Sequence, residues 1–119
     1  MLKFYHYANC DSCRKALKFL KASGRDFIAI PIRETPPEIE ELTLALKTMG
    51  GDLGKLFNRS GQDYRESNLK DKLPALSQKE ALGLLHGNGN LVKRPLLVGK
   101  KFAVAGFDEK NWDSLLAES

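Results

Sequence analysis

The chain passes from its first predicted strand to its first predicted helix through Tyr5-His6-Tyr7-Ala8-Asn9-Cys10-Asp11-Ser12-Cys13-Arg14-Lys15. Cys10 and Cys13 in this stretch are the only cysteines of the protein. A thiol at the start of a helix meets unpaired backbone N–H groups and the positive end of the helix dipole. Both favour the thiolate, which is the nucleophilic form of cysteine. The stretch therefore predicts a reactive sulfur at a strand-to-helix turn, with a second sulfur one helical turn away.

The residues on either side of this stretch predict a β-α-β unit. Leu2–Tyr7 is rich in aromatic residues and predicts a strand. The helix that follows has an apolar stripe of residues three or four apart, namely Cys13, Ala16, Leu17 and Leu20. Gly24 is expected to end this helix. Asp26–Ile32 predicts a second strand, and its run of apolar residues is typical of a buried one.

Two capping boxes predict helices in the middle of the chain. Thr35 and Glu38 form the first, and Pro36 suits the first helical position that follows Thr35. Ser77 and Glu80 form the second, ahead of another apolar stripe. We therefore expect one helix to begin at Thr35 and another at Ser77.

The last part of the chain predicts a β-hairpin and a helix. Pro95–Val98 and Phe102–Ala105 are short apolar runs separated by a Gly-Lys-Lys turn. Asp108 is expected to cap the final helix, with Phe107 and Trp112 packed together as a hydrophobic staple.

This order of elements predicts an α/β protein with a thioredoxin-like fold. The expected core is a four-stranded mixed sheet, with a helical insertion at about residues 36–90 between its βαβ and ββα halves. No repeat, low-complexity segment or linker divides the sequence, so residues 1–119 are predicted to form a single domain.

Composition excludes several classes of protein. The chain is 42% hydrophobic and 29% charged, which is ordinary for a soluble globular protein. No run approaches the roughly 18 apolar residues of a membrane span, and the N-terminus lacks the pattern of a signal peptide. We therefore expect a cytoplasmic protein without a membrane partner. The formal charge of +4 is spread over small groups of Lys and Arg rather than one dense stripe, so direct binding to nucleic acid is not expected.

A metal site is not expected either. The C-x-x-C pair supplies half of a zinc site, and the sequence offers no second pair of ligands. His6 and His86 are too far apart in the pattern to complete one. The prediction is therefore no metal and no tightly bound cofactor.

Five motifs are spread along nearly the whole chain. They are N-C-D-S-C-R-K-A (Asn9–Ala16), R-E-T-P-P (Arg33–Pro37), L-F-N-R-S-G (Leu56–Gly61), K-R-P-L-L-V (Lys93–Val98) and V-A-G-F-D-E (Val104–Glu109). In this order the sequence resembles the arsenate reductase family, ArsC, which includes the YffB and Spx branches. The C-x-x-C pair is similar to Spx proteins, whereas L-F-N-R-S-G is closer to YffB.

The resemblance implies roles for particular residues. Cys10 would be the nucleophile that attacks arsenate, Arg94 would bind the oxyanion, and Pro95 would be in the cis form. Arg59 lies beside the position of a second arginine, whose strict equivalent is Asn58. The family's third arginine is replaced near Ala105, a departure from the enzymes that reduce arsenate.

The residues themselves leave two roles open for Cys13. Its spacing from Cys10 suits a resolving thiol, while its place on the apolar stripe suits a small core residue. Arg94 and, more weakly, Arg59 are candidates for an anion clamp, because guanidinium binds oxyanions in a bidentate manner. The predicted site thus comprises Cys10 and Cys13 with Arg94 as catalytic residues, and Arg59, Arg94 and Pro95 as substrate-binding residues.

Two functions follow from the sequence. The first is a thiol-dependent reductase in which Cys10 attacks an oxyanion or a glutathione mixed disulfide, with glutathione as co-substrate and glutaredoxin or thioredoxin as reductant. The second is an Spx-like redox-sensing regulator that binds the RNA polymerase α subunit, with Cys10 and Cys13 as its switch.

Overall fold

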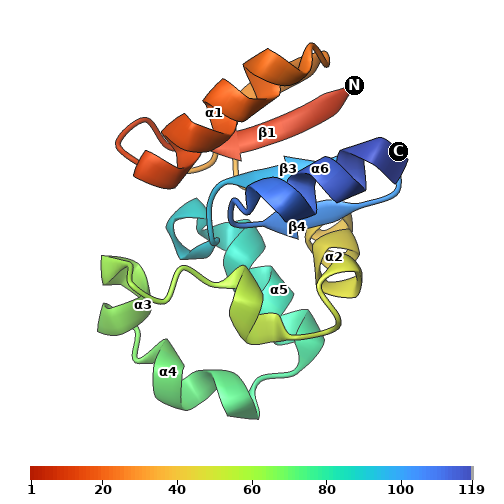
Figure 1. Cartoon of the computed structure of the whole chain (residues 1–119). Helices are drawn as coiled ribbons and strands as arrows, with labels where there is room; N and C mark the ends of the chain where they lie inside the picture. The colour runs from red at the N-terminus through yellow and green to blue at the C-terminus, as the bar shows by residue number, and fades with distance from the viewer. Residues whose placement is uncertain (119) are drawn as a thin grey trace.

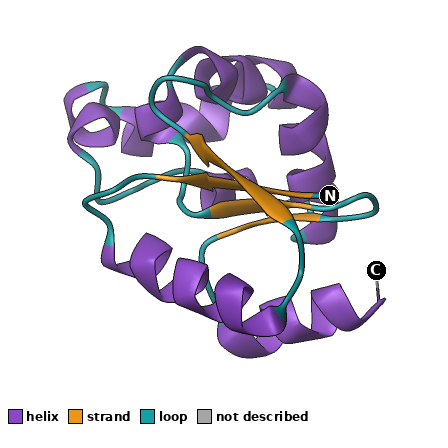
Figure 2. Cartoon of the chain, turned by 90° about the horizontal axis from the view of Figure 1, so that it is seen from above, coloured by secondary structure: helices purple, strands orange, loops and turns teal. Residues whose placement is uncertain are grey.

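A mixed β-sheet lies between two layers of helices in the computed structural model, which describes residues 1–118 (Figures 1 and 2). The strands are β1 (Leu2–His6), β2 (Phe27–Pro31), β3 (Leu96–Val98) and β4 (Ala103–Ala105). The α-helices are α1 (Asp11–Ser23), α2 (Ile39–Thr48), α3 (Gln62–Glu66), α4 (Leu69–Lys72), α5 (Gln78–Gly87) and α6 (Glu109–Glu118). Short 3-10 helices are η1 (Leu53–Leu56), η2 (Leu73–Ala75) and η3 (Gly89–Leu91).

The strand order is β2-β1-β3-β4. β1 is parallel to β2 and antiparallel to β3, and β3 is antiparallel to β4. The elements from α2 to η3 separate the βαβ half from the ββα half. The predicted thioredoxin-like fold, with its four-stranded mixed sheet and helical insertion, is therefore confirmed.

The sheet separates two hydrophobic cores because alternate residues of a strand point to opposite faces. In β1, Tyr5 belongs to the core beneath α2 and α5, whereas Phe4 belongs to the core beneath α1 and α6. The same alternation in β3 divides Leu96 from Leu97. Trp112 of α6 is fully buried in the second core, where its ring packs edge-on against Phe4.

The prediction that the second strand is buried is wrong. β2 is an edge strand, and Ile28, its second residue, is 48% exposed. A run of apolar residues cannot distinguish an edge strand from a central one, because the number of neighbouring strands is a property of the whole sheet. The opposite edge, β4, is covered by the end of α2, where Thr48 Oγ1 accepts a hydrogen bond from the Ala103 N–H at 3.3 Å.

The first capping box is also displaced from its predicted position. The N-cap of α2 is Glu38, and the box pairs Glu38 with Glu41 rather than Thr35 with Glu38. Thr35 precedes Pro36 and Pro36 precedes Pro37, and a residue before proline is disfavoured in the helical region. The helix therefore begins only after the second proline.

Three other predictions about the ends of helices are confirmed. Ser77 caps α5 through a capping box with Glu80, as predicted. Gly24 ends α1 with φ +72°, a conformation that glycine adopts without strain. Phe107 packs against Trp112 with ring centroids 4.9 Å apart, which confirms the staple at the start of α6.

A part of the helical insertion has no counterpart in the sequence predictions. The helices α3, α4 and η2 each contain five residues or fewer, too short for an apolar period to identify them. The link between α3 and α4 is Asn68 with φ +54°, a left-handed conformation that asparagine tolerates better than most residues.

A buried carboxylate attaches α2 to the centre of the sheet. Glu41 Oε1 accepts hydrogen bonds from the Tyr5 hydroxyl at 2.6 Å and from the Glu38 N–H at 3.0 Å. Its Oε2 pairs with Lys3 Nζ at 3.0 Å. Burial acts to raise the pKa of Glu41, but these three partners outweigh it and hold that pKa below its ordinary value. Burial and the neighbouring carboxylate raise the pKa of Tyr5, which therefore remains a hydrogen-bond donor.

Replacing Tyr5 by Phe is expected to lower the free energy of unfolding by about 1–3 kcal/mol, because a buried hydrogen bond to a charged group is lost. Urea denaturation followed by circular dichroism measures this change. The matched control is Tyr64→Phe, which alters another buried tyrosine outside the Glu41 cluster. Equal losses in the two variants would contradict a specific role for the bond to Glu41.

Candidate active site

The pairing of β1 with β3 brings the cysteine loop to the Arg-Pro segment. Tyr5 lies opposite Leu96 in this antiparallel pair. The residues that follow β1 therefore lie beside the residues that precede β3. In this way Tyr7 and the loop to Cys10 reach Arg94, which is far away in the sequence.

Cys10 is the N-cap of α1. Its backbone is extended, with φ −130° and ψ 115°, and its Sγ accepts a hydrogen bond from the Cys13 N–H at 3.3 Å. The thiol is partly exposed. An N–H donor and the start of a thirteen-residue helix both interact favourably with negative charge on this sulfur. The geometry has the features of a site for an accessible, reactive thiolate.

Cys13 occupies a different environment although it is one helical turn away. It is 3% exposed and packs in the core beneath α1 and α6. Burial and a hydrogen bond to Cys10 raise the pKa of the Cys13 thiol to about 12, while the Tyr7 backbone and Arg94 act in the opposite direction. Both cysteines are free thiols. In this state Cys13 is a protonated core residue at neutral pH.

Arg94 and Pro95 lie at the end of the sheet next to the cysteine loop. The Arg94–Pro95 peptide bond is cis, as the family resemblance implied. Pro95 is buried, and its carbonyl accepts a hydrogen bond from the Gly106 N–H at 2.8 Å. The Arg94 guanidinium carbon lies 4.6 Å from the centre of the Tyr7 ring, in a cation–π contact. Arg94 is half-buried, so its charge acts on the nearby thiols with less screening than a fully exposed charge.

Arg33 is a second arginine at this place, and no pattern in the sequence predicts a role for it. Its guanidinium carbon lies 4.9 Å from the centre of the Tyr7 ring, and Nη1 donates a hydrogen bond to the Tyr7 hydroxyl at 2.9 Å. Arg33 follows β2, and the sequence distinguishes it only as the first residue of the R-E-T-P-P motif. The parallel pairing of β1 with β2, which no local pattern reveals, brings it beside Tyr7.

Arg59 lies elsewhere. Its Nε donates a hydrogen bond to the Gly54 carbonyl at 3.1 Å, and its guanidinium lies where a side chain at position 54 would stand. It lines a hollow with Lys55 and Ser60, whereas Arg94 lines two other cavities. Asn58 is the neighbour that does share a cavity with Arg94. Arg59 and Arg94 therefore line different cavities among the described residues 1–118.

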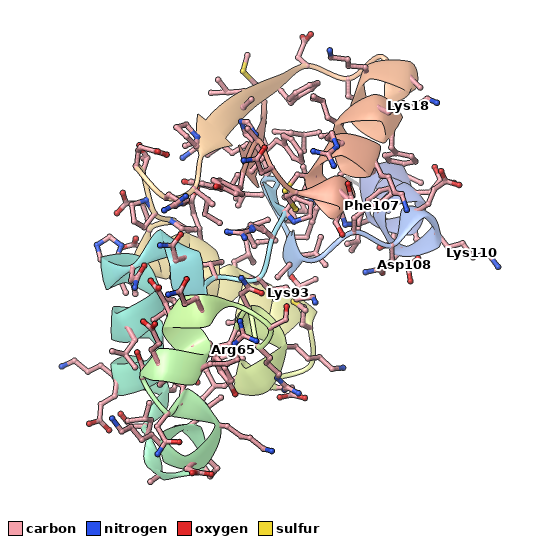
Figure 3. The ribbon with its side chains drawn as sticks, turned by 90° about the vertical axis from the view of Figure 1, so that its left-hand side faces the viewer. Lys18, Arg65, Lys93, Phe107, Asp108 and Lys110 are labelled. Carbon is pink, nitrogen blue, oxygen red and sulfur yellow. The ribbon has the colours of Figure 1, made fainter. Side chains whose placement is uncertain are left out.

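An open groove of about 410 Å³ runs from the start of α1 to the start of α6. Ser12, Lys93 and Arg94 contribute to its walls, together with Phe107 and Asp108. Figure 3 shows Lys93, Phe107 and Asp108 in one region, on the segments that flank β3 and β4. The groove combines cations with apolar surface, so an anionic ligand with an apolar part fits its chemistry.

Residues 1–118 contain no cluster of three or more His, Cys, Asp or Glu side chains arranged to hold a metal ion. None of the helices in that range is long and apolar enough to cross a membrane.

The sequence profile of the ArsC family matches residues 5–115. The chain belongs to the ArsC family. Among its relatives is the uncharacterized protein YusI of Bacillus subtilis, which is 45% identical and aligns over 93% of this chain and 98% of YusI. A solved structure described as a possible arsenate reductase of Streptococcus mutans is 42% identical, with a TM-score of 0.85, and the match covers 95% of this chain and 98% of that one.

Other relatives of this chain are named for different functions. The regulatory protein MgsR of Bacillus subtilis is 31% identical over 90% of this chain and 83% of its own length. An arsenate reductase of Yersinia enterocolitica is 27% identical, over 82% of this chain and 67% of that protein. The global transcriptional regulator Spx of Enterococcus faecalis is 29% identical, over 92% of this chain and 81% of Spx. Membership of the family is therefore compatible with either an enzyme or a regulator.

The raised pKa of Cys13 leads to a prediction about alkylation. In a Cys10→Ser variant, the folded protein is expected to react with iodoacetamide at pH 8 at least ~10-fold more slowly than the same chain in denaturant, because each unit of pKa reduces the thiolate about tenfold. The rate in the folded state should keep rising above pH 9.0, the ordinary value for the thiol. Mass spectrometry of quenched samples measures both rates. Equal rates in the folded and denatured states would contradict the buried, protonated Cys13.

Proposed function

We propose that this ArsC-family protein is a thiol-dependent reductase in which Cys10 is the nucleophile. The observation that carries the proposal is the environment of Cys10: a partly exposed Sγ at the N-cap of α1 that accepts the Cys13 N–H. A cysteine with a purely structural role packs best in a hydrophobic core, as Cys13 does, and not at a partly exposed helix N-terminus.

For a glutathione mixed disulfide, the Cys10 thiolate attacks the glutathione sulfur. A new disulfide forms between Cys10 and glutathione, and the other half of the substrate leaves as a thiolate. A second thiol then attacks this disulfide and releases glutathione. Two thiols thus supply the two electrons, and glutathione, glutaredoxin or thioredoxin restores the reduced enzyme.

For arsenate, the chemistry begins at the same sulfur. The Cys10 thiolate bonds to arsenic, and an arsenate oxygen leaves as water after protonation. Attack of a second thiol on the Cys10 sulfur breaks the sulfur–arsenic bond, releases arsenite and leaves a disulfide. In both reactions Arg94 would bind the anionic group, with Arg59 as a weaker candidate and Pro95 shaping the wall beside it.

Cys13 is the proposed source of the second thiol, and its burial sets a condition on that role. A protonated thiol attacks poorly, so Cys13 must be exposed or deprotonated after Cys10 is modified. If an external thiol is faster, Cys13 acts only as a core residue. Both routes need a reducing compartment, which fits a cytoplasmic protein with two free thiols.

Incubation of the reduced protein with glutathione disulfide, followed by mass spectrometry of the intact chain, tests this proposal. We expect the Cys13→Ser variant to gain one glutathione at Cys10. We expect the Cys10→Ser variant to gain none and to lose at least ~100-fold in thiol-coupled turnover of mixed disulfide or arsenate, because the nucleophile is removed. Full turnover by Cys10→Ser with every oxidant would refute the proposal.

The second candidate is an Spx-like regulator that binds the RNA polymerase α subunit. The C-x-x-C pair and the likeness to Spx and MgsR favour it. In this case a Cys10–Cys13 disulfide would be a switch without turnover. Its formation would require the core around Cys13 to open, since that sulfur is buried beneath α1.

Binding to purified RNA polymerase α subunit, with and without oxidant, separates the two candidates. The reductase predicts no binding that depends on the cysteines. Binding to the oxidised protein that is lost in both Cys10→Ser and Cys13→Ser would favour the regulator and count against the enzyme.

A further inference from the structure

The helical insertion contains a hollow that is separate from the candidate active site. Its volume is about 690 Å³, and its walls come from residues 51–54 around η1 and from positions between 59 and 76 in and around α3, α4 and η2. Neither the cysteine loop nor the Arg94–Pro95 segment contributes to it. The insertion packs on the opposite face of the sheet from α1 (Figure 1). The volume lies within the roughly 300–1,000 Å³ of pockets that enclose small ligands.

Tyr64 of α3 carries an unpartnered hydroxyl at this hollow. The residue is only 7% exposed, and its ring packs against Phe57. Among residues 1–118 its hydroxyl has no hydrogen bond, yet no side-chain oxygen in that range is both buried and without a partner. The hydroxyl is therefore the part of Tyr64 that reaches the surface, at the hollow that the residue lines. The hydroxyls of Tyr5 and Tyr7, in contrast, both take part in hydrogen bonds.

Two cations and one carboxylate set the charge of the wall. Arg59 Nε donates a hydrogen bond to the Gly54 carbonyl at 3.1 Å, and its other N–H donors have no partner within the described residues 1–118. Lys70 lines the hollow from α4 and is in no ion pair in that part of the chain. Asp52 Oδ1 accepts the Gly54 N–H at 3.0 Å. These three charged side chains leave a single net positive charge.

The remainder of the wall is mainly apolar. Leu53, Leu73 and Leu76 line the hollow, are half-buried, and pack against the core on this face of the sheet. Pro74 lies beside them and is exposed. Moving apolar surface out of water is favourable, so a ligand with an apolar body gains free energy by covering these side chains. A small inorganic anion would leave the same surface in contact with water.

These features select one class of ligand. A carboxylate carries one negative charge and two acceptor oxygens, so a guanidinium and a tyrosine hydroxyl can bind it together. An amine would instead meet two like charges. We propose that the hollow binds a small amphipathic monocarboxylate, such as a medium-chain fatty acid, with Arg59 and Tyr64 on the carboxylate and the three leucines on the apolar body. This role goes beyond the proposed function and requires no thiol chemistry.

Titration of the reduced protein with octanoate tests the site. Amide, leucine methyl and Arg59 Nε–Hε chemical shifts are followed by NMR at constant ionic strength, since salt screens exposed charges. We expect saturable shifts around the hollow and none at the Cys10 amide. Tyr64→Phe should raise the Kd at least ~5-fold, because a hydrogen bond to a charged group is lost. The same change should leave the folded protein intact, since the hydroxyl has no partner to lose among residues 1–118.

Charge variants test the sign of the ligand. Arg59 is also a weaker candidate for substrate binding, so the matched pair is taken from α4. Lys70→Gln should raise the Kd about 2- to 5-fold, whereas Lys72→Gln removes an exposed lysine that does not line the hollow and should leave the Kd within about 1.5-fold. Asp52→Asn should lower the Kd, because a negative charge is removed and asparagine caps a helix as well as aspartate does.

Two further probes separate the carboxylate from the apolar body. Acetate keeps the carboxylate without the chain, and octan-1-ol keeps the chain without the charge. Each should bind at least ~10-fold more weakly than octanoate, because each loses one of the two contributions. If either bound as tightly as octanoate, the hollow would be a general anion site or an apolar groove, and the proposal would be overturned.

The outcomes also separate this site from the reductase. Cys10→Ser should bind octanoate with an unchanged Kd, and Tyr64→Phe should keep the reactivity of Cys10 toward glutathione disulfide. Shifts that do not saturate, or an equal Kd for Tyr64→Phe and the unaltered protein, would overturn the carboxylate site and leave the reductase standing. An unreactive Cys10 in a protein that binds octanoate would refute the reductase and support this site.

Discussion

The antiparallel pairing of β1 with β3 is the constraint on which the rest of the site depends. It places Tyr5 opposite Leu96, so the loop after β1 and the segment before β3 meet at one end of the sheet. The parallel pairing of β1 with β2 adds the segment after β2 at the same end. The strand pairing thus brings the start of the cysteine loop together with Arg33 and Arg94, both of which contact Tyr7. The Glu41 cluster, buried beside Tyr5, holds α2 against this central strand.

The two cysteines illustrate how one helical turn separates two chemical environments. Cys10 stands at the N-cap, where the first backbone N–H groups of the helix lack intrahelical partners and one of them, that of Cys13, donates to its Sγ. Cys13 lies on the face of α1 that packs against the sheet and is almost completely buried. The sequence could predict both the helix start and the apolar stripe from local spacing. In the proposed reaction Cys10 reacts from its present, partly exposed position. Cys13 can react only after its thiol is exposed or deprotonated.

Two predictions about secondary structure were wrong, each for its own physical reason. The apolar run of β2 was taken for a buried strand, but β2 has a neighbour on one side only. The Thr35 capping box was displaced because the two prolines exclude the helical region at the residues before them. The role of Arg59 stays a prediction, although its Nε bonds to the Gly54 carbonyl and it lines a different hollow from Arg94. The error on β2 concerns neighbours that are distant in sequence, whereas the error on the capping box arose because two local rules had to be weighed against each other.

The sequence by itself determined the order of the strands and of the longer helices, the thiol at the start of α1 and the cis Arg94–Pro95 bond that its family motif implied. These features depend on spacing and residue type over a few neighbouring positions. Only the tertiary structure decided which cations face the cysteine loop, because a side chain's partners follow from strand pairing and not from its neighbours in sequence. Arg33, whose motif gave no hint of its role, reaches Tyr7 for that reason. The packing of α1 on the sheet likewise buries Cys13. This burial raises the pKa of the Cys13 thiol and keeps it protonated at neutral pH.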